Sequence, residues 1–364
     1  MLKLVIYFVL FFNTLVSFAE PQDNQLISWK NGDFDYVGGF SLPPGEQEGG
    51  TFNYSGGTIG LSEDGKKLLV HGFRKFDKDG GVAEVLIPPK LSKSALIQDL
   101  PVAEMSQSFF KFMDNAASGN PQVNDTYSGI YAYKNTIFFN TLKWYDGDGD
   151  NTHFTLALDG TDFMRENLRG FFGIQGGAKA SGWISPVPQE WRATLGCDHL
   201  SGNSSGYSII NRLSVGPSAY CVDLDVVIDS QSEVSTIPTS PLMSFSLENQ
   251  IQHNVDPSWD LHNTLDRNAT PIEPQNNDLW THTSRAGYGF IIPKTNTYAV
   301  FGTSSGHASG LGYKIKQDDG RLCGGYCPPS ASDWSHYVWL FKVSDFLKVI
   351  SGELLAHQIV PYEY

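Results

Sequence analysis

The acidic loop Asp146-Gly-Asp148-Gly-Asp150 has the residue types and spacing of a cation site. Carboxylates at alternate positions of a loop can surround one hard cation, and calcium takes about six to eight oxygen ligands in flexible geometry. An EF-hand loop also needs glycine at its sixth position and glutamate at its twelfth, where this chain has Asn151 and Ala157. The loop therefore predicts a structural calcium ion, with a solvated acidic turn as the alternative.

A second group of reactive residues lies in the segment from Trp280 to Tyr288, directly before a predicted strand. Arginine pairs bidentately with a carboxylate, and histidine or tyrosine can remove the proton from the neighbouring carbon while its partner protonates the leaving oxygen. These are the steps of a lyase acting on uronic-acid polysaccharides. We predict Arg285 as the anion clamp and His282, Tyr288 and His307 as its catalytic partners. The alternative is that these side chains only hold loops together.

Polar residues also follow the middle strand of several predicted strand triplets. His71 and Asn140 occupy this position in two of them, and Ser304-Ser305-Gly306-His307 occupies it in a third. In a propeller these strand ends would meet at one mouth of the central channel. We therefore predict His71, Tyr313 and Trp280 as substrate-binding residues.

Other catalytic signatures are missing from the sequence. There is no P-loop and no G-x-G-x-x-G after a strand, so we expect no nucleotide cofactor. A glycosidase needs two facing carboxylates, but 39 acidic residues leave that choice open. The net charge of −14 disfavours binding to nucleic acid, because the chain repels phosphates.

The chain has four cysteines, an even number that favours two disulfides in an exported protein. Closeness in sequence favours the pairs Cys197–Cys221 and Cys323–Cys327, although four cysteines allow three pairings. The alternative is a metal site made by Cys323, Cys327 and a histidine.

The elements that must position these residues are mainly strands. Helical periodicity is nearly absent, and short β-branched and aromatic runs are separated by turn residues, including 37 Gly and 19 Pro. This pattern predicts an all-β protein. With 40% hydrophobic residues, the chain has enough apolar material for a packed core.

Three segments share a plan of strand, tight turn, strand, loop and strand. They begin near Gly57, Tyr127 and Tyr288, and 207–227 resembles a distorted fourth copy. A meander of this kind cannot bury both faces alone, and repetition around an axis solves the problem. We predict a β-propeller of about five to seven blades, because blades usually take about 40–50 residues. A large β-sandwich is the alternative.

The first 19 residues predict export. Lys3 precedes a continuously apolar run, and Ser17-Phe18-Ala19 supplies the small residues of a cleavage site. We predict a signal peptide over 1–19, a single propeller domain over 20–364 and a secreted protein, extracellular or periplasmic. No later segment is long and apolar enough for a membrane span, and the alternative for 1–19 is an uncleaved anchor.

Three further segments of the sequence resemble those of a known group of proteins. Gly182–Gly196 (GWISPVPQEWRATLG) has the character of a rigid surface lid, and it accompanies Gly216-Pro217-Ser218-Ala219 and the opening DYVGGFSLP at 35–43. Together they resemble uncharacterised secreted bacterial proteins of β-propeller type. The resemblance implies a shared fold and no particular reaction.

These observations lead to two hypotheses about function. One is a secreted carbohydrate-active enzyme, either a polysaccharide lyase or a glycoside hydrolase. The other is a propeller without catalytic activity that binds a glycan or a protein partner outside the cell. The acidic chain repels polyanions, so neutral sugars or a protein suit its charge better.

Overall fold

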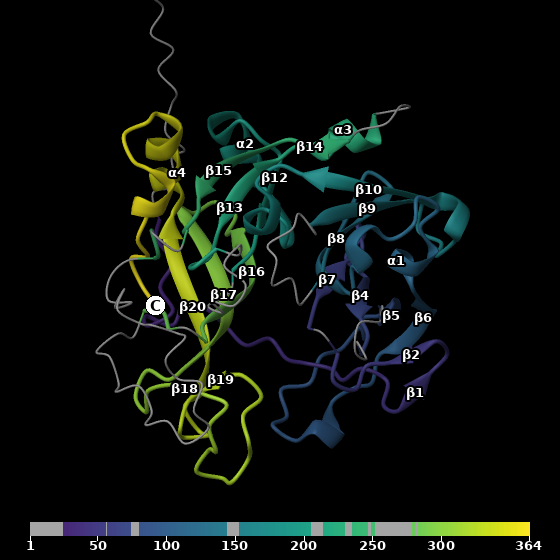
Figure 1. Ribbon diagram of the computed structural model, residues 1–364, viewed down its shortest axis with the longest axis horizontal. Coiled ribbons are helices and arrows are strands. Elements are labelled where there is room, and N and C mark those ends of the chain that lie inside the picture. Colours follow the sequence, from purple (N-terminus) through teal and green to yellow (C-terminus); the bar gives the residue numbers. More distant parts are fainter. Residues whose placement is uncertain are drawn as a thin grey trace, which may run out of the picture.

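Four mainly antiparallel sheets follow one another along the chain and are arranged like the blades of a propeller (Figure 1). Strands dominate the secondary structure, as the sequence predicts. The computed structural model describes residues 25–364 except 56, 74–79, 144–152, 205–213, 230–234, 247–248, 252–278 and 282.

Blades 1 and 2 come from the N-terminal half of the chain. The strands of blade 1, in order across the sheet, are β3 (Ile59–Leu61), β4 (Lys67–His71), β5 (Val82–Leu86) and β6 (Glu104–Phe110). Those of blade 2 are β7 (Thr126–Tyr133), β8 (Thr136–Leu142), β9 (Phe154–Asp159), β10 (Leu168–Ile174) and β14 (Thr236–Ile237). The short strand β14 pairs parallel to β10, so the chain returns from blade 3 to complete blade 2.

Blades 3 and 4 come from the C-terminal half. The strands of blade 3 are β11 (Trp183–Pro186), β12 (His199–Gly202), β13 (Ala219–Val222) and β15 (Thr239–Met243). Those of blade 4 are β16 (Arg285–Ile291), β17 (Thr297–Ser305) and β20 (Trp334–Lys342). The predicted tight turns at Asp64-Gly65, Lys134-Asn135 and Lys294 to Asn296 connect the first two strands of blades 1, 2 and 4.

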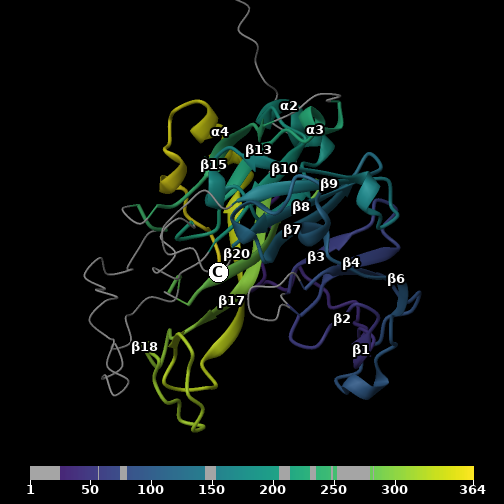
Figure 2. The same ribbon diagram turned by 45° about the vertical axis from the view of Figure 1, so that its right-hand side comes forward.

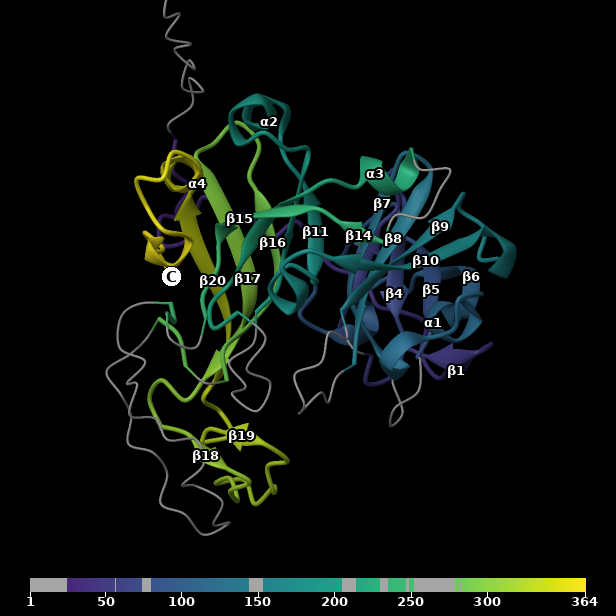
Figure 3. The ribbon, with the colours of Figure 1, turned by 45° about the horizontal axis from the view of Figure 1, so that its top comes forward.

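The remaining elements are short. The helices are α1 (Phe112–Asn115), α2 (Gln189–Leu195), α3 (Asp225–Ile228) and α4 (Val343–Ile350). The single 3-10 turns are η1 (Ile97–Asp99), η2 (Pro121–Val123), η3 (Arg165–Asn167), η4 (Gly177–Lys179) and η6 (Ala356–Gln358). Two-residue strands form the pairs β1 (Glu46–Gln47) with β2 (Gly50–Thr51) and β18 (Gly312–Tyr313) with β19 (Tyr326–Cys327). Figures 2 and 3 show α2 at the opposite end of the molecule from β18.

The first strands of the blades contact one another in succession, β3 with β7, β7 with β11 and β11 with β16. Glycine makes this approach possible. A Cβ on Gly60 would lie 2.6 Å from the carbonyl oxygen of Ile130, and one on Gly129 would overlap the carbonyl oxygen of Gly182. The inner strands therefore pack backbone against backbone, as glycine at a close approach allows.

The N-terminal segment links the last blade to the first. The backbone of Ile27 donates to the Thr297 hydroxyl in blade 4, and Gly39 forms a bridge with Ser92 in blade 1. The Tyr362 hydroxyl also donates to the Ile27 carbonyl oxygen, at 2.6 Å. Both ends of the described chain thus meet on blade 4.

The blade number corrects the sequence prediction, because the structure has four blades and not five to seven. Successive blades begin 57 to 102 residues apart, at Ile59, Thr126, Trp183 and Arg285. The residues beyond the usual length of a blade lie in the long connections between strands. In its described part, 214–227, the predicted fourth copy at 207–227 contains one strand of blade 3, since that blade begins before it.

Replacement of Gly129 by alanine tests the inner-strand packing. We expect Gly129→Ala to lower the free energy of unfolding by about 2 kcal/mol, because the new methyl group must displace the backbone of blade 3. Urea unfolding measures the change. Gly324→Ala is the matched control, since nothing lies within 4 Å of a Cβ there. Equal midpoints for Gly129→Ala and wild type would contradict this account.

Candidate functional site

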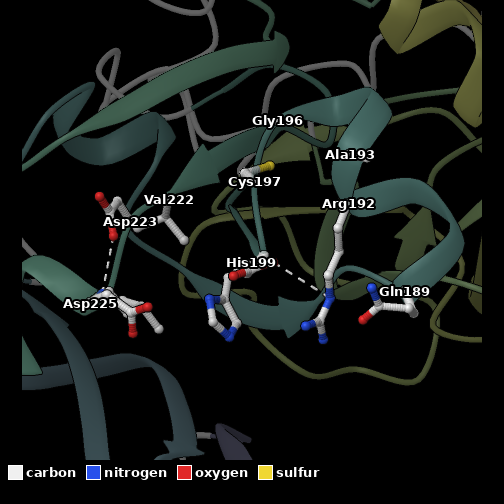
Figure 4. Close-up of a pocket in the computed structure, with 11 residues that line it drawn as sticks. Gln189, Arg192, Ala193, Gly196, Cys197, His199, Val222, Asp223 and Asp225 are labelled. Carbon is white, nitrogen blue, oxygen red and sulfur yellow. Dashed lines mark hydrogen bonds and ion pairs between the residues drawn. The ribbon is translucent and has the colours of Figure 1, made fainter. Parts of the chain in front are cut away.

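A cavity of about 550 Å³ opens between blade 3 and the helices α2 and α3 (Figure 4). Its wall combines a helix surface, the start of β12 and the chain that leaves β13. The lining residues with polar or disulfide-bonded side chains include Gln189, Arg192, Cys197, Asp198, His199, Asp223 and Asp225. We call this cavity the His199 pocket.

The segment from Gly182 to Gly196 builds one wall of the pocket. Pro188 precedes α2 and Gly196 ends it in a left-handed conformation, with φ of 73°. The buried Trp191 anchors the helix, since its indole N–H donates to the Thr295 carbonyl oxygen at 2.9 Å. The sequence predicts a rigid surface lid here, and the helix instead packs firmly against blade 4.

The disulfide Cys197–Cys221 holds the wall beneath the helix. It joins the turn after α2 to β13, with Cα atoms 5.7 Å apart. Cys323–Cys327 is the second disulfide, so both predicted pairs are confirmed. The first pair fixes the chain just before His199, because Cys197 precedes it by two residues.

His199 is the most buried titratable residue of the pocket, with 3% of its surface exposed. Its ring lies edge-on to the rings of Tyr133 and Tyr131, at centroid distances of 4.3 and 5.4 Å. Neither ring nitrogen has a hydrogen-bond partner among the described residues. Figure 4 shows the imidazole between Asp225 and Arg192, directed into the opening.

Burial lowers the pKa of His199 to about 4, the loss of hydration being the largest cause. Asp198 and Asp225 oppose this shift, whereas Arg192 and Lys134 add to it. At neutral pH the imidazole is therefore uncharged, with one nitrogen donating and the other accepting hydrogen bonds.

The charged side chains around His199 are largely paired. The Lys134 ammonium donates to both carboxylate oxygens of Asp225, at 3.0 and 2.9 Å, and this bond raises the pKa of Lys134. Arg192 Nε donates to the Val187 carbonyl oxygen and lies 3.6 Å from Asp198. These contacts keep the two carboxylates next to positive charge.

Tyr131 and Tyr133 form an aromatic pair beside the pocket. They are two residues apart on β7, so both side chains leave the same face of the strand. Their rings are nearly parallel, at 22°, with centroids 6.4 Å apart. Both are half-buried, and burial raises the pKa of Tyr131 well above its usual range.

The predicted catalytic residues do not form one described cluster. His282 lies outside the described residues. Arg285 pairs with Thr303 across the sheet, whereas the next residue on that strand, Ser304, makes a 2.6 Å hydrogen bond with His307. Because adjacent residues on a strand point to opposite faces, Arg285 and His307 lie on opposite faces of blade 4. This separation argues against the predicted anion clamp beside His307.

Three further residues that the sequence predicts for the site instead contribute to packing within and between blades. Tyr288 is half-buried and donates to the Ile184 carbonyl oxygen of blade 3 at 3.2 Å. Trp280 is 1% exposed and packs against Trp339, so its ring offers no face to a sugar in this structure. His71 is fully buried against Tyr127, between blades 1 and 2.

The predicted convergence of polar strand ends also needs correction. Asn140 is buried and donates to the Gly182 carbonyl oxygen, and it accepts from the Thr155 hydroxyl at 2.7 Å. These polar groups join neighbouring blades and do not line an open mouth. For Tyr313, the structure places the backbone in β18.

The predicted calcium ligands Asp146, Asp148 and Asp150 lie outside the described residues, so the calcium site stays a prediction. Within the described part of the chain, no group of three or more His, Cys, Asp or Glu residues could hold a metal ion. In the same part, no helix has both the length and the apolar character needed to cross a bilayer.

Comparison with protein-family models, with curated proteins and with solved structures finds no match to this chain. The four-bladed arrangement is consistent with the resemblance to secreted propeller-type proteins, and it identifies no family. The site must therefore be interpreted from its own geometry.

Sequence reasoning missed the polar residues of the pocket, which include Arg192, His199, Asp223 and Asp225. Two signals pointed towards them. The segment at 182–196 is unusually rich in proline and tryptophan. Tyr131 and Tyr133 lie two residues apart along a predicted strand. Neither signal showed that β7 and β12 would place their side chains together.

The pH dependence of stability tests the burial of His199. Its folded pKa of about 4 is below the unfolded value of about 6.5, so acidification adds a proton to the unfolded chain first. Stability is therefore lost as pH falls below about 6.5, by about 2 kcal/mol at pH 5. We expect His199→Gln to reduce this loss between pH 7.5 and 5, measured by urea unfolding.

The exposed His336 provides the control, and His336→Gln should keep the wild-type pH dependence. A His199→Gln variant with the same pH dependence as wild type would show that His199 titrates normally.

Removal of each disulfide tests its contribution to the stability of the fold. Cys197 and Cys221 are 24 residues apart, and Cys323 and Cys327 only four. On the chain-entropy estimate, replacing the first pair by serine lowers the free energy of unfolding by about 3.5 kcal/mol and the second by about 2 kcal/mol. Thermal and urea unfolding compare the two double variants. A larger loss for the second pair would contradict the estimate.

Proposed function

We propose that this protein binds a carbohydrate outside the cell and that the His199 pocket is its binding site. The observation that carries the proposal is the buried imidazole of His199. Its ring nitrogens face the cavity without a partner among the described residues, which is costly unless water or a ligand satisfies them.

The chemistry around His199 suits sugar hydroxyl groups, which both donate and accept hydrogen bonds. The neutral imidazole offers one donor and one acceptor, Arg192 adds donors and Asp223 adds acceptors. The half-buried rings of Tyr131 and Tyr133 contact the imidazole and place apolar surface beside it, although neither tyrosine lines the cavity. A concave site with few polar groups and adjacent aromatic surface is typical of small-ligand binding.

Binding is better supported than catalysis at this pocket. A lyase needs a base that accepts a proton near the working pH, and a histidine with a pKa of about 4 is a weak base at pH 7. A glycoside hydrolase needs one protonated carboxylic acid. Asp225 pairs with Lys134 and Asp198 lies 3.6 Å from Arg192, so each of these two carboxylates already has a cationic neighbour.

Export is the second part of the proposal. It rests on the signal-like segment at 1–19 and on the two disulfides, which persist in oxidising compartments.

A panel of oligosaccharides, measured by glycan array and isothermal titration calorimetry, tests the binding. We expect Arg192→Ala to weaken binding of the best ligand about tenfold, because it removes a charged hydrogen-bond donor from the wall. Arg165→Ala is the matched control, since Arg165 is exposed on η3 in blade 2. It should bind as the wild type does.

The same panel is assayed for new reducing ends and for the ultraviolet absorbance of unsaturated products. Absence of binding to every sugar would overturn the proposal. Turnover that survives Arg192→Ala would show instead that an enzymatic site lies elsewhere in the chain.

A further inference from the structure

We infer that the His199 pocket selects amino sugars whose amino group is free and carries a positive charge. This inference rests on the proposed function, because it names the class of sugar that the same pocket takes. It follows from three features of the described residues, which are the pairing of the carboxylates, the uncharged imidazole and the place of Lys134.

The carboxylates of the pocket outnumber its cations. Asp198, Asp223 and Asp225 line the cavity together with one arginine, Arg192. Asp225 pairs with Lys134, and Asp198 lies 3.6 Å from Arg192. Asp223 has no cationic partner among the described residues, so one negative charge in the wall is uncompensated.

Among the described residues, only one oxygen of Asp223 accepts a hydrogen bond. Its Oδ1 accepts from the backbone N–H of Asp225 at 3.1 Å, which holds the start of α3. The second oxygen has no partner in the described part of the structure. The side chain is exposed at the pocket wall, where it can accept from a cationic ligand.

The neutral His199 adds an acceptor of the right kind. An ammonium group only donates hydrogen bonds, and an imidazole that carries no charge presents a lone pair without repelling the cation. At 3% exposure His199 is held in place by its surroundings, and its ring is directed into the cavity.

Lys134 shows how this wall accommodates an ammonium group. Its Nζ lies 5.0 Å from the centroid of the Tyr133 ring and donates to Asp225. A cation between a tyrosine ring and a carboxylate is stabilised by both. The rings of Tyr131 and Tyr133, stacked at 22°, lie against His199. The choice of a sugar ring as the carrier of the second ammonium rests on the proposed function.

Calorimetry with two oligosaccharides of one length tests the inference, one of glucosamine and one of N-acetylglucosamine. We expect the wild type to bind the glucosamine oligomer at least about fivefold more tightly, because acetylation removes the charge. Added salt should reduce the difference.

Asp223→Asn is the decisive variant, because asparagine keeps the oxygen that accepts from Asp225. It should weaken the glucosamine oligomer about fivefold and change the N-acetylated oligomer less than about twofold. The matched control is Asp229→Asn, since Asp229 is an exposed aspartate at the opposite end of the same helix.

The outcomes separate the inference from the proposed function. Equal binding of the two oligomers, or an unchanged affinity in Asp223→Asn, overturns the inference and leaves carbohydrate binding intact. Absence of binding to both oligomers and to all other sugars overturns the proposed function as well. Binding of tetralysine through Asp223 without binding of any sugar assigns the pocket to lysine-bearing peptides and overturns both.

Discussion

The close approach of the inner strands is the constraint on which the arrangement depends. Gly60 and Gly129 have no side chain to hold neighbouring blades apart, so β3, β7 and β11 pack with their backbones in contact. This packing brings the tight turns of successive blades together at one end. There Glu63 accepts from the backbone N–H groups of Lys134 and Asn135, which joins blade 1 to blade 2.

The pocket forms where this framework meets the insertions of blade 3. Helix α2 and the turn after it cover β12, and the disulfide of Cys197 holds that turn to β13. His199 is consequently buried against two tyrosines from another blade. Its desolvation keeps the imidazole neutral, which favours hydrogen bonding to a ligand over transfer of a proton.

Charge influences which ligands the site can bind in two ways. The acidic chain as a whole repels polyanions, and the pocket wall has more carboxylates than cations. Long-range and local electrostatics thus act in the same direction, towards uncharged or cationic ligands. Arg285, the predicted anion clamp, lies on the far face of blade 4 from His307, so it makes no anionic subsite with that residue.

The sequence by itself determined the strand-rich class, three of the four blade meanders and both cysteine pairs, because alternation, turn residues and spacing are local properties. It misjudged the blade number, since insertions of unequal length hide the period. Tertiary structure alone decided the site. Tryptophan and histidine often bind ligands, but packing buries Trp280 and His71 in the interior. His199 lines a pocket because blades 2 and 3 meet beside it. Such contacts join residues more than 60 positions apart, and no local pattern of side chains records them.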